Sequence, residues 1–124
     1  MNYLIVFLGG GLGAALRHGV NVTMPRLVGN GFPYATLFEN VTGSFVMGLI
    51  VSWFAFKGQG SQEWRLFLTT GILGGYTTFS AFSLDFALLY ERDALGLAAL
   101  YVLASVGLSL LGIFAGLALV RALA

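Results

Sequence analysis

Four long apolar stretches divide the chain, and short polar segments separate them. The apolar stretches cover about residues 3–22, 34–56, 64–90 and 95–120. A helix that spans a membrane needs about 20 predominantly apolar residues. The pattern therefore predicts an all-α integral membrane protein with four transmembrane helices.

The polar segments between these stretches are too short to hold a second domain. They cover residues 23–33, 57–63 and 91–94. The first contains Pro25 and Pro33, so we expect it to end the first span. Trp64 and Arg65 are typical of an interfacial anchor at the start of the third span. We expect one four-span domain over residues 1–124, with both termini on the same side of the membrane.

The third stretch is unusual because glycines, paired threonines and phenylalanines interrupt it between Gly71 and Ser83. This composition predicts a helix that breaks inside the membrane. Broken backbone at that depth is tolerated only where it is buried in protein or lines a polar cavity, because the hydrocarbon offers no hydrogen-bond partners. Such breaks often mark ion or substrate sites in transporters, and a simple kink satisfied by neighbouring hydroxyls is the alternative.

The composition agrees with a membrane protein and excludes several functions. Of the 124 residues, 58% are hydrophobic and 9% are charged, and the mean hydropathy is +0.90, whereas about 25% of the residues of a soluble domain are charged. A net charge of +1 without a basic run gives no indication of a nucleic-acid-binding surface. The chain has no cysteine and a single histidine, His18, and no catalytic triad or phosphate loop is visible. We therefore expect no enzyme activity.

The basic residues do not set an orientation across the membrane. Lys57, Arg65 and Arg121 fall on one side, while Arg26 and Arg92 fall on the other, with Arg17 and His18 leaning the same way. A chain with so small a bias is expected to insert in both orientations. Two antiparallel copies would then form an inverted repeat like those of larger transporters. Orientation by weaker signals is the alternative.

Small residues recur at a spacing of four in every span. The pairs are Gly9 with Gly13, Ser44 with Gly48, Gly71 with Gly75, and Gly112 with Gly116. Small residues at this spacing let helix backbones approach closely, either within a chain or between chains. The pattern predicts tight helix packing, and the small size of the chain favours an oligomer over a working monomer.

Two polar stripes lie at helical spacing within the spans. The second span carries Thr36, Asn40, Gly43 and Met47, and the fourth carries Tyr101, Ser105, Ser109 and Gly112. A polar group inside hydrocarbon needs a partner helix or a wet passage, because an unpaired one is costly. For Ser105 and Ser109 alone, hydroxyls bonded to the helix backbone are the simpler explanation.

Phe79 and Phe82 lie one helical turn apart, just after the break, and are expected to project to the same side. Their neighbours Thr77, Thr78 and Ser80 are polar. The edge of a phenyl ring carries partial positive charge, so it can face a small anion. Ordinary packing against lipid or core is the alternative role for these two rings.

The segment Gly74-Gly75-Tyr76-Thr77-Thr78-Phe79-Ser80-Ala81-Phe82-Ser83 resembles the pattern G-G-x-T-T-F-S-T-F of the small fluoride channels of the Fluc, or CrcB, family. Asn40-Val41-Thr42-Gly43-Ser44 and Gly13-Ala14-Ala15-Leu16-Arg17 extend the resemblance over nearly the whole chain. The resemblance implies an antiparallel, dual-topology homodimer in the inner (plasma) membrane, with two pores that export fluoride passively.

The resemblance also implies which residues carry the function. The pores would be lined by Asn40, Phe79 and Phe82, together with a polar track of Thr36, Ser105 and Ser109. Backbone carbonyls of Gly74 and Thr77 would hold a structural sodium ion at the centre of the dimer. Arg17 and Glu39 are candidates for a vestibule.

Two positions depart from the family pattern. Ala81 lacks the hydroxyl that the family usually presents beside the phenylalanines, so its side chain has no polar atom with which to contact an ion. Glu39 stands where the family usually has an apolar residue. It is interpreted first as a rim residue, with a vestibule charge that repels anions or a proton-carrying group as alternatives.

Two other functions stay open at this point. One is a dual-topology, proton-coupled exporter of cationic or guanidinium compounds, similar to the small multidrug-resistance family, with Glu39 as its carboxylate. The usual signature of that family is a glutamate in the first span, which this chain lacks. The other is a packing subunit that conducts nothing.

Overall fold

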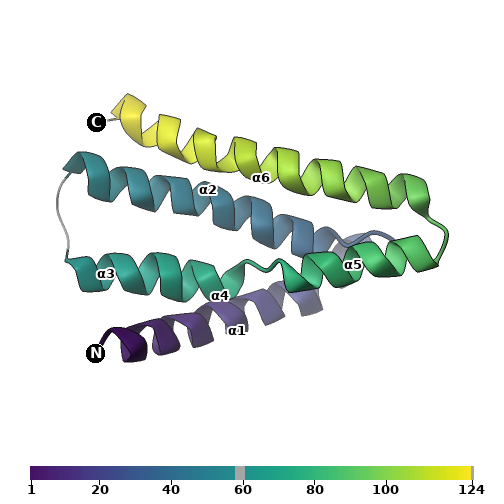
Figure 1. Ribbon diagram of the computed structural model, residues 1–124, viewed down its shortest axis with the longest axis horizontal. Coiled ribbons are helices and arrows are strands. Elements are labelled where there is room, and N and C mark those ends of the chain that lie inside the picture. Colours follow the sequence, from purple (N-terminus) through teal and green to yellow (C-terminus); the bar gives the residue numbers. More distant parts are fainter. Residues whose placement is uncertain (58–60, 124) are drawn as a thin grey trace.

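A computed structural model describes residues 1–57 and 61–123 of the chain as four long helical rods that run side by side (Figure 1). The elements are α1 (Asn2–Val28), α2 (Tyr34–Lys57), α3 (Gln62–Leu66), η1 (Phe67–Leu73), α4 (Gly74–Tyr76), α5 (Ser80–Glu91) and α6 (Leu95–Leu123). The four from α3 to α5 form the third rod. Both termini lie at the same end of the bundle, as four spans require.

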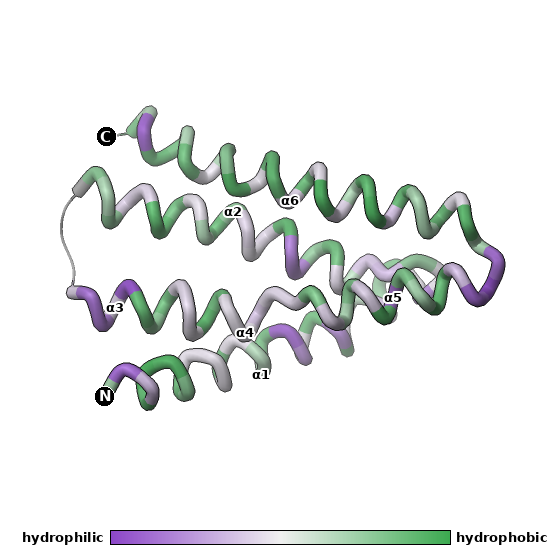
Figure 2. Tube along the Cα trace, viewed as in Figure 1, coloured by the Kyte–Doolittle hydropathy of each residue, from purple (hydrophilic) through white to green (hydrophobic). Residues whose placement is uncertain are grey.

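Four helical segments of the described chain are long and apolar enough to cross a membrane. They are Asn2–Val28, Tyr34–Phe56, Gln62–Glu91 and Leu95–Leu123. Hydrophilic residues gather at the ends of the rods and in stretches inside α1 and α2, whereas α6 is apolar along nearly its whole length (Figure 2). The prediction of an all-α protein with four membrane spans is confirmed.

The predicted end of the first span is wrong. We expected the helix to stop near residue 22, before Pro25, but α1 continues to Val28 with Pro25 inside it. Pro25 lacks the N–H that would bond to the preceding turn, yet it lies in the last turn, where its own carbonyl accepts from the Gly29 N–H at 2.9 Å. The helix ends at Gly29, whose φ of 80° is readily adopted only by glycine.

The third span begins close to its predicted start. The Ser61 hydroxyl caps α3 by accepting the Trp64 N–H at 3.2 Å. Trp64 is exposed and meets Phe67 edge-on at 5.9 Å, as suits a residue at a membrane interface. Part of the predicted polar segment 57–63, residues 58–60, lies outside the described residues.

Close approach of glycines holds the bundle together in two layers. In the first, α2 packs against α6, where a Cβ added at Gly48 would collide with the backbone of Ile113 and one at Gly116 with the backbone of Phe45. In the second, α1 packs against η1 and α4, where a Cβ at Gly13 would collide with the Ile72 carbonyl. The prediction of tight packing at small residues is confirmed.

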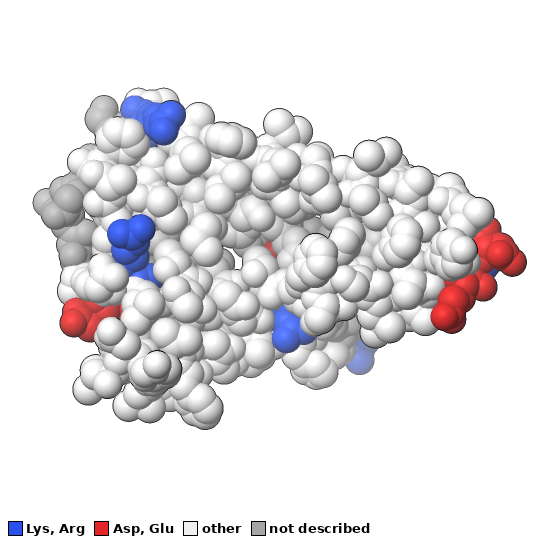
Figure 3. All heavy atoms as spheres, in the orientation of Figure 1, with Lys and Arg blue, Asp and Glu red and all other residues white. Residues whose placement is uncertain are grey.

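Charged side chains lie mostly at the two ends of the molecule. Figure 3 shows basic and acidic side chains at the end that holds the termini, acidic side chains with a basic one partly hidden behind them at the opposite end, and further basic groups between the two ends. Arg121, in the last turn of α6, lies over the Phe56 ring at 5.8 Å. In the same view a patch of acidic atoms is visible at the bottom of a hollow near the middle of the face.

Candidate functional site

The break in the third rod is real, and it lies at Thr77–Phe79. The glycines before it are helical: η1 makes wider π-type turns that include Gly71, and α4 includes Gly74 and Gly75. The backbone becomes extended at Thr77, with φ −85° and ψ 158°, and α5 begins at Ser80. Gly71 and Gly75 therefore serve the contact with α1, while the residues after them carry the break.

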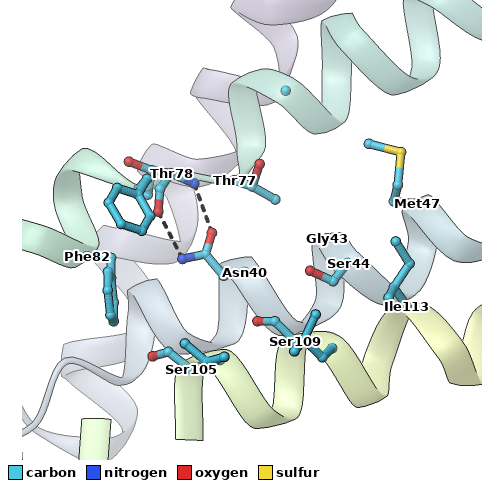
Figure 4. A pocket seen from close by; sticks show the side chains of 14 residues that line it. Asn40, Gly43, Ser44, Met47, Thr77, Thr78, Phe82, Ser105, Ser109 and Ile113 are labelled. Carbon is cyan, nitrogen blue, oxygen red and sulfur yellow. Dashed lines mark hydrogen bonds between the residues drawn. The ribbon is translucent and has the colours of Figure 1, made fainter. Parts of the chain in front are cut away.

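Asn40 holds the broken backbone in place. Its side-chain carbonyl accepts the Thr78 N–H at 2.8 Å, and its amide donates to the Thr78 carbonyl at 2.9 Å (Figure 4). One side chain on α2 thus satisfies both polar groups of a residue that has left the helix. Because each unpaired group would be costly inside a membrane, Asn40 stabilises the break.

A groove of about 570 Å³ lies beside this break, between the third rod, α2 and α6. Its lining includes five of the residues that the sequence analysis assigned to a pathway: Asn40, Phe79, Phe82, Ser105 and Ser109. In Figure 4, Ser105 and Ser109 follow one another along α6 on the side of the groove opposite the break. Residues far apart in the sequence therefore share one hollow.

The hydroxyls of Ser105 and Ser109 are buried and have no hydrogen-bond partner among the described residues. The simpler expectation, that they bond to the backbone of their own helix, is contradicted. A buried hydroxyl without a partner is a donor available to a ligand in the groove.

The two phenylalanines lie together, as predicted. Their ring centroids are 5.5 Å apart, and Phe82 is in turn 5.0 Å from the ring of Tyr101. Phe79 is 77% exposed on this single chain, which leaves one side of its ring free. The aromatic row runs from the groove into the core, because Tyr101 is fully buried.

The remaining members of the two polar stripes divide into two groups: Gly43 and Met47 also line the groove, whereas Thr36, Tyr101 and Gly112 do not. Thr36 is buried one turn before Asn40, near the Tyr101 hydroxyl. That hydroxyl donates to the Asp85 carboxylate at 3.0 Å. Gly112 does not face the groove and lies against α2, where an added Cβ would be 3.1 Å from the Val41 carbonyl. The stripes therefore divide between the groove and the packing behind it.

Arg17 and Glu39 do not line the groove. The Arg17 side chain donates from Nε to the Gly75 carbonyl at 3.1 Å, so it fastens α1 to the third rod just before the break. Glu39 is fully buried, and neither of its carboxylate oxygens has a hydrogen-bond partner among the described residues. The interpretation of Glu39 as a rim residue is wrong, because the neighbouring elements cover it completely.

Two backbone carbonyls, one in the break and one just before it, accept no hydrogen bond from the described residues. Within residues 1–57 and 61–123, the hydrogen bonds around the break use the carbonyls of Leu73, Gly75 and Thr78 and leave those of Gly74 and Thr77 without a donor. Gly74 and Thr77 also line the groove. Sodium ligands in transporters include carbonyls of unwound backbone, like that of Thr77, and carbonyls at the C-terminal end of a half-helix, like that of Gly74.

Sequence reasoning placed Asn40 in the pathway but missed its structural role. It also missed the hydrogen bond of 2.9 Å between the hydroxyls of Thr42 and Tyr76, which joins α2 to α4 beside the break. Both contacts link residues more than 30 positions apart. A single sequence carries no signal for such pairs beyond the presence of polar residues in apolar spans.

Known proteins match the chain over nearly its whole length. The family model described as "CrcB-like protein, Camphor Resistance (CrcB)" matches residues 4–117. A fluoride-specific ion channel FluC of Rhodopseudomonas palustris strain BisB5 is 69% identical over 99% of both chains. The fluoride-specific ion channel FluC 2 of Nitrobacter hamburgensis is 64% identical over 98% of both chains, and a FluC of Methylobacterium nodulans is 57% identical over 98% of this chain and 97% of its own.

Proposed function

The chain belongs to the CrcB-like protein family, and on that premise we propose that it is a fluoride-specific ion channel. It acts in the inner (plasma) membrane and lets fluoride leave the cell passively. The observation that carries the proposal is the groove in which Asn40, Ser105 and Ser109 gather around the Phe79–Phe82 pair beside a helix break.

The chemistry of the groove suits a small, strongly hydrated anion. A selective path must replace the water around fluoride with several close hydrogen-bond donors. The unpartnered hydroxyls of Ser105 and Ser109 are two such donors. The second N–H of the Asn40 amide is a third, since only one is used on Thr78. The positive edges of the phenyl rings add favourable electrostatics without a fixed charge.

We further propose that two copies assemble as an antiparallel homodimer with two pores. The groove is open on one side of the single chain, and Phe79, which lines it, is largely exposed. A second copy laid against this face would close the groove into a path. Basic residues occur near both ends of the bundle, which supports insertion in both orientations.

A structural sodium ion is part of the same proposal. In an antiparallel pair, two third rods cross at their breaks and bring the Gly74 and Thr77 carbonyls of both copies toward one point. Four carbonyl oxygens without donors would repel one another there. A monovalent cation removes the repulsion and ties the copies together.

The experiment that tests the proposal is fluoride efflux from liposomes that contain the purified protein, with Phe79→Ile and Phe82→Ile beside the parent. Ile keeps apolar bulk and removes the polarised ring edge. We expect rapid, voltage-driven fluoride efflux and no chloride efflux from the parent. Each Ile variant should remain a dimer on size exclusion and lose most of its flux.

Phe114→Ile is the matched control, because Phe114 is exposed on α6 and does not line the groove. It should keep parental flux. Absence of fluoride efflux from well-folded parent protein would reject the channel, while full flux in both groove variants would reject only the role of the rings.

A further inference from the structure

The carboxyl group of Glu39 is enclosed by protein and accepts no hydrogen bond from the part of the chain that the structure describes. It is fully buried on α2, and both of its oxygens are unpartnered among the described residues. An ionised carboxylate in such a place is expensive unless a positive partner or several donors meet it. The fluoride pathway proposed above makes no use of this group, so its presence inside the bundle needs a separate explanation.

A second copy of the chain does not supply the missing donor. The Glu39 oxygens are covered within a single chain, so a partner that packs on the outer surface leaves them untouched. Any counterpart to the carboxyl group must therefore be inside the same bundle. A proton is the smallest ligand that fits a closed site of this kind.

The groups that face Glu39 from the packed elements are few. Among the described residues, Arg17 on α1 and Asp85 on α5 are the charged ones within electrostatic reach, and Tyr101 on α6 is the neutral titratable one. The Arg17 Nε already donates to the Gly75 carbonyl, and the Asp85 carboxylate accepts from the Tyr101 hydroxyl. One arginine thus faces two acids, which leaves one negative charge unmatched when both acids are ionised.

We propose that Glu39 is a proton-binding site beside the fluoride pathway, and that fluoride passes quickly when Glu39 holds its proton and slowly when Glu39 is ionised. The inference rests on the proposed fluoride channel. It adds to that channel a control by the proton concentration, which none of the residues that line the groove provides.

Two connections place the charge of Glu39 close to the fluoride pathway. Glu39 directly precedes Asn40, which holds the break and lines the groove. Tyr101, which lies within electrostatic reach of Glu39, packs on the ring of Phe82 at 5.0 Å, and Phe82 lines the groove. In an interior of low polarity, a negative charge at this position raises the energy of a fluoride ion in the groove.

The test measures fluoride efflux from protein-containing liposomes with the same pH on both sides, in steps from about pH 5 to about pH 9. Protein-free liposomes at each pH correct for HF that crosses the lipid. We expect the flux of the parent to rise about tenfold toward the acidic end, and Glu39→Gln to give the fast rate at every pH because its side chain is neutral throughout.

Two further variants locate the effect. Glu63→Gln removes an exposed carboxyl group at the start of α3 and should keep the pH profile of the parent. Asp85→Asn removes the other acid near Arg17 and should keep a pH-dependent flux, although with a displaced midpoint. Size exclusion of each variant confirms that the assembly is intact.

The outcomes separate the two proposals. If no protein produces fluoride efflux at any pH, the channel itself is rejected. If the parent conducts but its flux is independent of pH, or if Glu39→Gln has the same pH profile as the parent, Glu39 is not the proton-binding site. A profile that flattens in Asp85→Asn and not in Glu39→Gln assigns the proton to Asp85 and also overturns the inference.

Discussion

Asn40 combines two roles that the sequence could not separate. Its place in a polar stripe predicted that it would face a pathway, and it does line the groove. Its two hydrogen bonds to Thr78, which hold the break, depend on how α2 and the third rod are placed in space. Helical spacing gives the face on which a residue lies and cannot give its partner on another helix.

Glu39 shows the same limit of reasoning from a single sequence, but here the prediction itself was wrong. A carboxylate near the start of a helix is usually exposed, which led to its interpretation as a rim residue. In the structure, the residues before it already belong to the bundle, and Thr36, one turn earlier, is buried as well. The depth of a residue in the bundle depends on neighbouring helices, which a single sequence does not place.

Ser105 and Ser109 allow stability and conduction to be separated at the scale of single residues. Because their hydroxyls bond to none of the described residues, Ser105→Ala and Ser109→Ala should change the free energy of unfolding little. Loss of these donors from the groove should nevertheless lower fluoride flux clearly. Thermal unfolding in detergent and liposome efflux measure the two effects on the same preparations.

Ser52→Ala is the control for this pair. The Ser52 hydroxyl is buried away from the groove and donates to the Leu117 carbonyl at 3.3 Å. Its removal should cost about 0.5–1 kcal/mol of stability and leave the flux unchanged. The reverse pattern, with unchanged flux in both groove variants, would show that the two hydroxyls play no part in the path.

At the scale of helices, the sequence predicted well which apolar helices exist and which one is broken, but it predicted their boundaries less well. All four spans were found because each is long and apolar, and the break was found because glycines and threonines interrupt the third. The expectation that a helix stops before a proline placed the end of the first helix too early. Pro25 lies in the last turn of α1, where its carbonyl can still accept a helical hydrogen bond. Helix ends depend on which carbonyls find donors, and here the donor was the Gly29 N–H.

The crossing of α1 over η1 and α4 should not accept a side chain at Gly13. A Cβ there would collide with the Ile72 carbonyl and approach the Tyr76 N at 2.8 Å. Both contacts are with backbone atoms, which cannot move away by a change of side-chain rotamer. We expect Gly13→Ala to lower stability by about 1–3 kcal/mol, because overpacking forces the two helices apart. The midpoint of thermal unfolding in detergent measures this loss.

Gly11→Ala is a closely matched control on the same helix. Gly11 is exposed, and a Cβ at this position would meet nothing within 4 Å. The substitution should be neutral or slightly stabilising, since Ala is the better helix former. Equal loss of stability in both variants would mean that glycine flexibility, rather than close approach, is what α1 requires.

At the scale of the whole molecule, the free carbonyls of Gly74 and Thr77 predict a dependence on sodium. If a cation neutralises these oxygens where two chains cross, dialysis into sodium-free buffer should lower fluoride flux, and added sodium should restore it. Potassium, which is larger, should restore less. Full flux after thorough sodium removal would indicate that protein groups alone satisfy the break.

The orientation of the whole chain gives the most direct test of the antiparallel dimer. Basic residues near the two ends of the bundle are so evenly matched that neither end is favoured on the cytoplasmic side. The chain contains no cysteine, so a single one placed at exposed Ser61 marks one end and a single one at exposed Asp93 marks the other. In membranes that hold equal numbers of both orientations, an impermeant thiol reagent applied outside should label about half of the molecules of either variant. Permeabilisation of the membrane should then make the other half accessible to the reagent.

A chain with one fixed orientation would label completely at one position and not at all at the other. That result would reject insertion in both orientations, and an antiparallel pair of identical chains could not then form.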